Sequence, residues 1–182
     1  MEGRSPVDKR ALPLIILGGA ECVWDDLEAA QKILTEFDVA AVNDAGVEFS
    51  GHLSFWATLH QEKFAIWQRH RAQRRRDMGC LMVSRRKHAN TRIDRVVPER
   101  WRGSSGLYAV QVAMTLGYTR MVLCGIPMDK TPHFFRNEAW QAASRYRLGW
   151  KDAVSEIHEH VRSMSGWTRG LLGAPSVEWL TQ

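Results

Sequence analysis

The fold of this chain is organised by one stretch, Gly103 to Asp129, which reads GSSGLYAVQVAMTLGYTRMVLCGIPMD. After a Gly/Ser loop, Leu107 and Met114 begin and end a run of apolar residues at helical spacing. Gly117 predicts the end of that helix, because glycine readily adopts the left-handed conformation that closes helices. The apolar run 121–124 is typical of a parallel strand that is covered on both faces. We therefore expect a loop, a helix, a tight turn and a buried strand in this order.

The loop at the start of this helix is a candidate ligand site. Ser104 or Ser105 can cap the helix, since serine is a favoured N-cap residue. The first N–H groups of a helix have no intrahelical partners, and together with the helix dipole they attract anions. We expect Ser104, Ser105 and Gly106 to form an anion site there. The alternative is a serine-capped helix that binds no ligand.

Composition bounds the class of protein. The 182 residues are 45% hydrophobic, which predicts a single domain over 1–182 with a loose polar tail at 1–10. No apolar run is long enough for a membrane span, and the N-terminus lacks the apolar core of a signal peptide. Three separated cysteines without zinc-site spacing indicate a reduced, cytoplasmic setting and no metal.

Apolar runs alternate with helical patterns along the chain, which indicates a mainly parallel sheet. We expect strands at 12–17, 37–42, 55–60, 79–84 and 121–124, and further helices at 24–35 and 63–76. The segment 140–182 reads as mostly helical, with a break near Gly149. The sequence therefore predicts a Rossmann-like α/β fold with about five strands, helices on both faces and a helical C-terminal layer.

Glycine and asparagine residues follow the first two expected strands. Ligands of open α/β sheets bind outside the carboxyl ends of the strands. Gly18 and Gly19 follow the first strand, where backbone N–H groups can face a phosphate, although the full GxGxxG pattern is absent. Asn43 follows the second strand and can offer a donor and an acceptor to a base or sugar. A simple turn is the alternative at Asn43.

The formal charge of +5 is concentrated in one part of the chain. Between Arg69 and Arg95 there are ten lysines and arginines against two aspartates. Arg85, Arg86 and Lys87 come directly after the fourth expected strand, where they would balance the charge of a bound phosphate. The alternative is a non-catalytic module whose basic stretch contacts nucleic acid. The lack of aromatic residues for base stacking in that stretch makes this alternative the weaker one.

The stretch quoted above resembles the bacterial sialyltransferases of glycosyltransferase family 42 and the related Rossmann-like proteins of the 6-hydroxymethylpterin diphosphokinase type. The likeness is carried by SSGLY at 104–108, LGY at 116–118 and GI at 125–126, with weaker matches at 18–22 and at Asn43. The resemblance implies a nucleotide or nucleotide-sugar ligand and a small glycosyltransferase-like enzyme. At two positions of the 18–22 loop the chain departs from the family, with glycine in place of asparagine and cysteine in place of serine.

The resemblance also implies a catalytic histidine in or near a lid, and His133 follows the fifth expected strand. An imidazole, which titrates near neutral pH, suits the role of general base toward a sugar hydroxyl. The alternative for His133 is an exposed loop residue. A second enzymatic alternative is diphosphate transfer from ATP, with Mg²⁺ held by Asp44 and Asp129. The sialyltransferase-like reading implies no cofactor.

Overall fold

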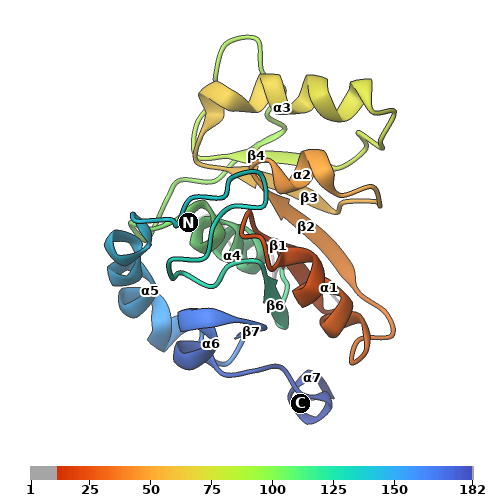
Figure 1. Ribbon diagram of the computed structural model, residues 1–182. Helices are drawn as coiled ribbons and strands as arrows, with labels where there is room; N and C mark the ends of the chain where they lie inside the picture. Colours follow the sequence, from red (N-terminus) through yellow and green to blue (C-terminus); the bar gives the residue numbers. More distant parts are fainter. Residues whose placement is uncertain (1–11, 182) are drawn as a thin grey trace, which may run out of the picture.

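A computed structural model describes residues 12–181, so the tail expected at 1–10 lies outside the described residues. The described chain is an α/β protein with one open, all-parallel sheet (Figure 1). The strands are β1 (Leu14–Leu17), β2 (Asp38–Val42), β3 (Phe55–Thr58), β4 (Leu81–Ser84), β5 (Arg95–Val96), β6 (Met121–Cys124) and β7 (Val161–Ser163). The helices are α1 (Val23–Gln31), α2 (Ala45–Glu48), α3 (Gln61–Gln73), α4 (Ser105–Thr115), α5 (Ala143–Ile157), α6 (Gly166–Leu172) and α7 (Val177–Thr181).

The strand order is β5-β4-β3-β2-β1-β6-β7, so the chain reverses direction across the sheet beside β1. Strands β1 to β5 follow one another toward one edge, and α4 then carries the chain back to β6 on the other side of β1. Leu14 pairs with Met121 and Leu17 with Cys124, so β1 and β6 end at the same level. This reversal is a topological switch point, where open α/β sheets have their ligand crevice.

Both faces of the sheet are covered by helices, as the sequence predicts. Leu14 and Ile16 of β1 pack with α4 and α5 on one face. Ile15 and Leu17 pack with α1, α2 and α3 on the other face. All four side chains are fully buried, which explains why β1 is a continuous apolar run without polar alternation.

The prediction of about five strands was too low, because the sheet has seven within residues 12–181. The two additional strands lie at its edges. β5 is only two exposed residues long, and β7 is the short segment Val-Arg-Ser. Their pairing with β4 and β6 creates them, since neither carries an apolar run of its own. The C-terminal part, predicted to be a helical layer, therefore also contains a strand.

The last helix, α7, returns to the sheet face that α1 covers. Its Trp179 is 7% exposed and belongs to the cluster on that face. The guanidinium carbons of Arg120 and Arg162 lie 5.4 and 4.8 Å from the centroid of the Trp179 ring. These cation–π contacts attach the end of the described chain to residues beside β6 and within β7. Among residues 12–181, no helix has the length and apolar character that crossing a membrane requires.

Helix α5 is continuous through Gly149, so the predicted break there is wrong. The glycine serves packing instead. A Cβ atom at Gly149 would lie 1.8 Å from the carbonyl oxygen of Arg102 and 3.1 Å from the Cα of Gly103. Helix α5 can therefore approach the loop before α4 only because this position has no side chain.

We expect Gly149→Ala to lower the free energy of unfolding by about 1–3 kcal/mol, because the methyl group overlaps a backbone carbonyl that must move. The matched control is Gly170→Ala in α6, where an added Cβ meets nothing within 4 Å. Alanine at Gly170 should stabilise the protein by roughly 0.5–1 kcal/mol through helix propensity. Chemical denaturation of both variants measures the difference. If the two variants are equally stable, the loop at Arg102 moves aside for the added methyl group without cost.

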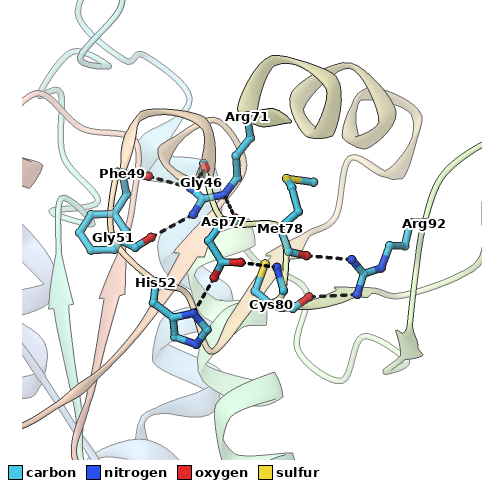
Figure 2. Close-up of polar contacts among 10 residues, drawn as sticks. Gly46, Phe49, Gly51, His52, Arg71, Asp77, Met78, Cys80 and Arg92 are labelled. Atoms are coloured by element: carbon cyan, nitrogen blue, oxygen red, sulfur yellow. Dashed lines mark hydrogen bonds and ion pairs between the residues drawn. The ribbon is translucent and has the colours of Figure 1, made fainter. Parts of the chain in front are cut away.

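Several arginines of the basic stretch at 69–95 form hydrogen bonds or ion pairs with other parts of the fold. Arg71 is the clearest example. Arg71 lies on α3, is fully buried, and donates to four backbone carbonyl oxygens (Figure 2). Its Nε bonds Asp77 at 2.7 Å, Nη1 bonds Gly46 and Phe49 at 2.6 and 2.7 Å, and Nη2 bonds Gly51 at 3.0 Å. Burial lowers the pKa of this guanidinium.

Arg92 has a similar role near β4. Its Nη1 donates to the Met78 carbonyl at 2.8 Å and its Nη2 to the Cys80 carbonyl at 3.3 Å (Figure 2). Arg74 pairs with Glu48 at 2.5 Å. Arg71 and Arg92 therefore close loops whose carbonyl groups need donors, whereas Arg74 pairs with a carboxylate.

Candidate functional site

A pocket of about 460 Å³ lies at the carboxyl ends of the central strands, at the switch point between β1 and β6. Its floor consists of residues that directly follow β1, β2, β3, β4 and β6. The N-terminus of α4 and the 131–146 segment add the walls. The lining includes Gly18, Gly19, Asn43, His60, Gln61, Arg85, Arg86, Glu99, Gly103, Ser104, Ser105, Gly106, Gly125, Met128, His133, Trp140 and Tyr146.

Nearly all site residues proposed from the sequence meet in this pocket. They are Gly18, Gly19, Asn43, Arg85, Arg86, Ser104, Ser105, Gly106 and His133, which come from five separate parts of the chain. Lys87 is the exception. Its ammonium group donates to the backbone carbonyl of Ile93 and does not line the pocket. The loop after β4 therefore presents two cations to the pocket.

Ser104 is the N-cap of α4, which resolves the choice between the two serines. Its Oγ accepts from the N–H of Leu107 at 3.4 Å and from the indole N–H of Trp150 at 3.3 Å. Ser105 instead accepts from the N–H of Leu59 at 3.4 Å, which ties α4 to the end of β3. With Ser104 engaged in this way, the remaining N–H groups of the first turn of α4 are the donors available to a ligand.

Gly106 is required by packing as well as by any close approach of a ligand. A Cβ atom there would lie 2.9 Å from Cγ2 of Ile126. Ile126 itself lines the pocket in the loop after β6. A larger residue at Gly106 would therefore displace this wall, so the position cannot test ligand contact separately from packing.

Asn43 is held in an unusual backbone conformation at the end of β2, with φ of 52°. Asparagine tolerates this left-handed region better than most residues. Its Oδ1 accepts from Thr58 Oγ1 at 2.7 Å, and its carbonyl oxygen accepts from the indole of Trp56 at 2.6 Å. These bonds orient the amide so that Nδ2 remains as a donor at the pocket floor.

His133 is fixed against the loop after β1. Its Nδ1 lies 3.0 Å from the carbonyl oxygen of Gly19. A carbonyl can only accept, so Nδ1 carries the proton and the neutral ring has its lone pair on Nε2. The ring stacks on Phe135 at 5.3 Å and meets Trp140 edge-on at 5.5 Å. Gly19 permits this contact, because a Cβ there would lie 2.8 Å from Nδ1.

The two arginines of the pocket differ in their partners. Arg85 forms an ion pair with Glu99, with Nη1 and Oε2 3.0 Å apart. Arg86 contacts Gln61 through Nε and Nη2 at 3.0 Å when the amide oxygen faces the guanidinium. Because the Gln61 amide is neutral, Arg86 has no ion-pair partner among residues 12–181, although the carboxylate Glu62 also lines the pocket.

Sequence reasoning missed several residues of the pocket. Trp140 and Tyr146 stack on each other at 5.7 Å and form an aromatic wall beside His133. The sequence gives no local signal for this role, since Trp140 reads like the other tryptophans that pack the C-terminal helices. Gln61 and Glu99 were also missed, because their place in the pocket depends on their contacts with Arg86 and Arg85.

Acidic and thiol groups near the switch point have structural partners. Asp26 Oδ2 accepts from the Gly125 N–H at 2.8 Å and from Ser165 Oγ at 2.6 Å, which joins α1 to the loops after β6 and β7. Burial raises the pKa of the Cys22 thiol to about 11, so this residue stays protonated at neutral pH. Within residues 12–181, no group of three or more His, Cys, Asp and Glu residues is placed to hold a metal ion.

Comparisons of the whole chain with protein-family models, with curated proteins and with solved structures found no match in any of the three. The interpretation of the pocket therefore depends on its own geometry and chemistry.

Proposed function

We propose that this protein binds a nucleotide or nucleotide-sugar and acts as a small, sialyltransferase-like glycosyltransferase. The observation that carries the proposal is the convergence of three ligand-binding elements on one pocket at the switch point. These are the Gly18-Gly19 loop, the side chain of Asn43 and the N-terminus of α4. Such crevices are the usual ligand sites of doubly wound sheets.

The phosphate groups of the ligand are assigned to the Arg86 side of the pocket. Arg86 supplies a guanidinium that has no acidic partner within the described part of the chain, and the N-terminus of α4 supplies N–H groups and the positive end of the helix dipole. Ser105 Oγ accepts from the Leu59 N–H and so ties the start of α4 to the end of β3. The Nδ2 donor of Asn43 faces the base or the sugar in this arrangement.

His133 is the general base of the proposed transfer. Its Nε2 takes the proton of an acceptor hydroxyl while the hydroxyl oxygen forms a bond to the anomeric carbon of the donor sugar. The bond between that carbon and the phosphate oxygen breaks, and its electron pair leaves with the nucleotide. The Gly19 carbonyl supports this role because it holds the proton on Nδ1 and leaves Nε2 free to accept.

The two alternatives are supported less well. Diphosphate transfer from ATP would use Asp44 and Asp129 for Mg²⁺, but Asp129 Oδ1 already accepts from the N–H and Oγ1 of Thr131 at 2.9 and 2.5 Å. Burial raises the pKa of Asp44, which disfavours its ionised form. A nucleic-acid module would use the cations of the basic stretch, of which Arg71 and Arg92 are bonded within the fold while Arg69 stays exposed.

Isothermal titration with CMP, CDP, UDP, GDP and their sugar conjugates tests the proposal. We expect at least one of these ligands to bind, and Arg86→Gln to weaken binding by about tenfold or more through loss of a charged hydrogen-bond donor. The matched control is Arg69→Gln, which removes an exposed arginine of α3 outside the pocket.

No binding of any ligand at millimolar concentration would overturn the proposal. Magnesium-dependent turnover of ATP would favour the diphosphokinase alternative. Binding to single-stranded nucleic acid that weakens steeply with salt would favour the nucleic-acid module.

A further inference from the structure

A second depression of the surface is lined by aromatic rings and carboxylates. Its lining consists of Glu21, Trp24, Glu48, Phe134 and Phe135. These residues come from the loop after β1, from the start of α1, from the end of α2 and from the loop after β6. Trp24 is 36% exposed and Phe135 is 50% exposed, an unusual degree of exposure for large aromatic side chains.

Backbone hydrogen bonds hold the walls of this depression in place. The N–H of Glu21 donates to the carbonyl oxygen of Pro132 at 2.9 Å, and the N–H of Phe134 donates to that of Gly19 at 3.0 Å. An isolated antiparallel bridge joins the same two loops. A site whose walls are already fixed loses less conformational entropy when it binds a ligand, so the depression is organised in advance.

The three rings stand at steep angles to one another and form walls instead of a flat patch. The centroids of Trp24 and Phe134 are 6.0 Å apart with an interplanar angle of 48°, and those of Phe134 and Phe135 are 5.3 Å apart with an angle of 82°. The face of an aromatic ring is electrically negative, so such walls attract a cation. The guanidinium carbon of Arg136 already lies 5.4 Å from the centroid of Phe135, which leaves Trp24 and Phe134 as the rings for a ligand.

The charges of the depression favour the same class of ligand. Glu48 is balanced by its ion pair with Arg74. Glu21 is exposed and forms no ion pair among residues 12–181, so one negative charge beside the rings is uncompensated. Arg136 is also exposed, and water and salt therefore screen its repulsion of a second cation. Rings and carboxylate together attract a cation and repel a phosphate.

The rings also select among cations. A primary ammonium group is strongly hydrated and needs hydrogen-bond acceptors for its three N–H donors. A quaternary ammonium group carries methyl groups instead, so it can pack on ring faces without losing hydrogen bonds, and aromatic cages are its usual binding sites. The lining of only five residues suits a cation of a few atoms and not a segment of a partner chain.

We propose that the depression lined by Glu21, Trp24, Glu48, Phe134 and Phe135 binds a small quaternary ammonium cation of the choline type. The methyl groups of the cation pack on Trp24 and Phe134, and Glu21 supplies the opposite charge. This site does not depend on the proposed function, because none of the five residues lines the pocket at the switch point.

The test compares choline with 3,3-dimethylbutan-1-ol, a neutral molecule of the same shape in which carbon replaces the nitrogen. Saturation-transfer NMR and isothermal titration with the full chain measure binding. We expect choline to bind about tenfold more tightly than the alcohol, and Trp24→Ala to weaken choline binding by about fivefold or more. Glu21→Gln should weaken it by about two- to threefold. Leu148→Ala is the control, since Leu148 is an exposed apolar residue of α5 outside both cavities.

Several results would overturn this inference. One is the absence of choline binding at millimolar concentration, and another is equal affinity for choline and the neutral alcohol. Choline binding that Trp24→Ala and Leu148→Ala weaken equally would overturn the assignment to the depression. Binding of a trimethyllysine peptide by a protein that does not bind free choline would overturn the choice of a small cation. A dimer in sedimentation that Trp24→Ala converts to a monomer would show that a second copy of the chain covers the depression.

The nucleotide titrations keep this inference separate from the proposed function. Trp24→Ala should bind nucleotides as the wild type does, because Trp24 does not line the pocket. Choline binding by a protein that binds no nucleotide would support the cation site and overturn the proposed function alone.

Discussion

Replacing Arg71 with methionine is expected to lower the free energy of unfolding by about 3–5 kcal/mol. Methionine fills much of the volume of the arginine stem but has no N–H groups. Four carbonyl oxygens would each lose a donor, namely those of Gly46, Phe49, Gly51 and Asp77. The hydrogen bond from Arg71 to Gly46 is buried. Urea denaturation followed by fluorescence measures this loss.

Two further variants make the prediction specific. Arg71→Lys keeps the charge but replaces the planar fork by a single ammonium group, which cannot reach four carbonyls at once. We therefore expect Arg71→Lys to fall between the wild type and Arg71→Met. Arg69→Met removes an exposed arginine two positions earlier on α3 and should change stability little. If Arg71→Met and Arg69→Met are equally stable, the hydrogen bonds of Arg71 contribute nothing to the free energy of unfolding.

Arg71 also acts on the pocket, although it lies outside it. Its bond to Gly46 fixes the first turn of α2, which begins two residues after Asn43. Gly46 lies close to the Trp56 ring, and the Trp56 indole N–H donates to the Asn43 carbonyl. The left-handed conformation of Asn43 is therefore supported by α3 through α2 and β3. Strained residues at ligand sites commonly depend on such surroundings.

The central part of the fold could be predicted from the sequence because its strands are covered on both faces. β1 and β6 read as apolar runs, and the glycine and serine residues after β1 and before α4 indicate where each loop begins. The strand ends of a parallel sheet meet at one edge, so residues that follow different strands were correctly expected to lie together. Gly19, Asn43 and Arg86 are examples.

The parts that could not be predicted depend on contacts between distant segments. β5 and β7 are strands only because β4 and β6 offer them a free edge. Lys87 follows the same strand as Arg86, yet its ammonium group bonds Ile93 because the loop after β4 folds back on itself. The role of Trp140 in the pocket requires the loop after β6 to lie against Gly19, and no local pattern encodes that.

The basic stretch shows that a cluster of charged residues in a sequence does not by itself indicate a binding function. A run rich in arginine predicts a surface that attracts phosphates, and Arg86 of this run lines the pocket. Arg71 and Arg92, from the same run, instead donate to backbone carbonyls. Sequence alone does not separate these roles, because both use the same guanidinium donors and differ only in the partner that the fold supplies.

Replacing His133 with alanine is expected to lower the rate of sugar transfer by about 10²–10⁴-fold, the usual contribution of a general base. The affinity for the nucleotide alone should remain that of the wild type, because the phosphate contacts are assigned to Arg86 and the start of α4. Release of nucleotide from the sugar donor that titration identifies measures the rate. His158→Ala, which removes an exposed imidazole of the described chain outside the pocket, is the control.

A second measurement tests the geometry on which the proposed role of His133 as a base depends. The Gly19 carbonyl should hold the proton on Nδ1, which is the less common form of a neutral imidazole, and ¹⁵N NMR distinguishes the two forms. Comparison with His133→Ala assigns the resonance. Gly19→Ala, whose Cβ would lie 2.8 Å from Nδ1, should displace the ring and lower the transfer rate together with the Nδ1–H signal. If His133→Ala transfers sugar at the wild-type rate, the imidazole is not the general base and is only part of the aromatic wall.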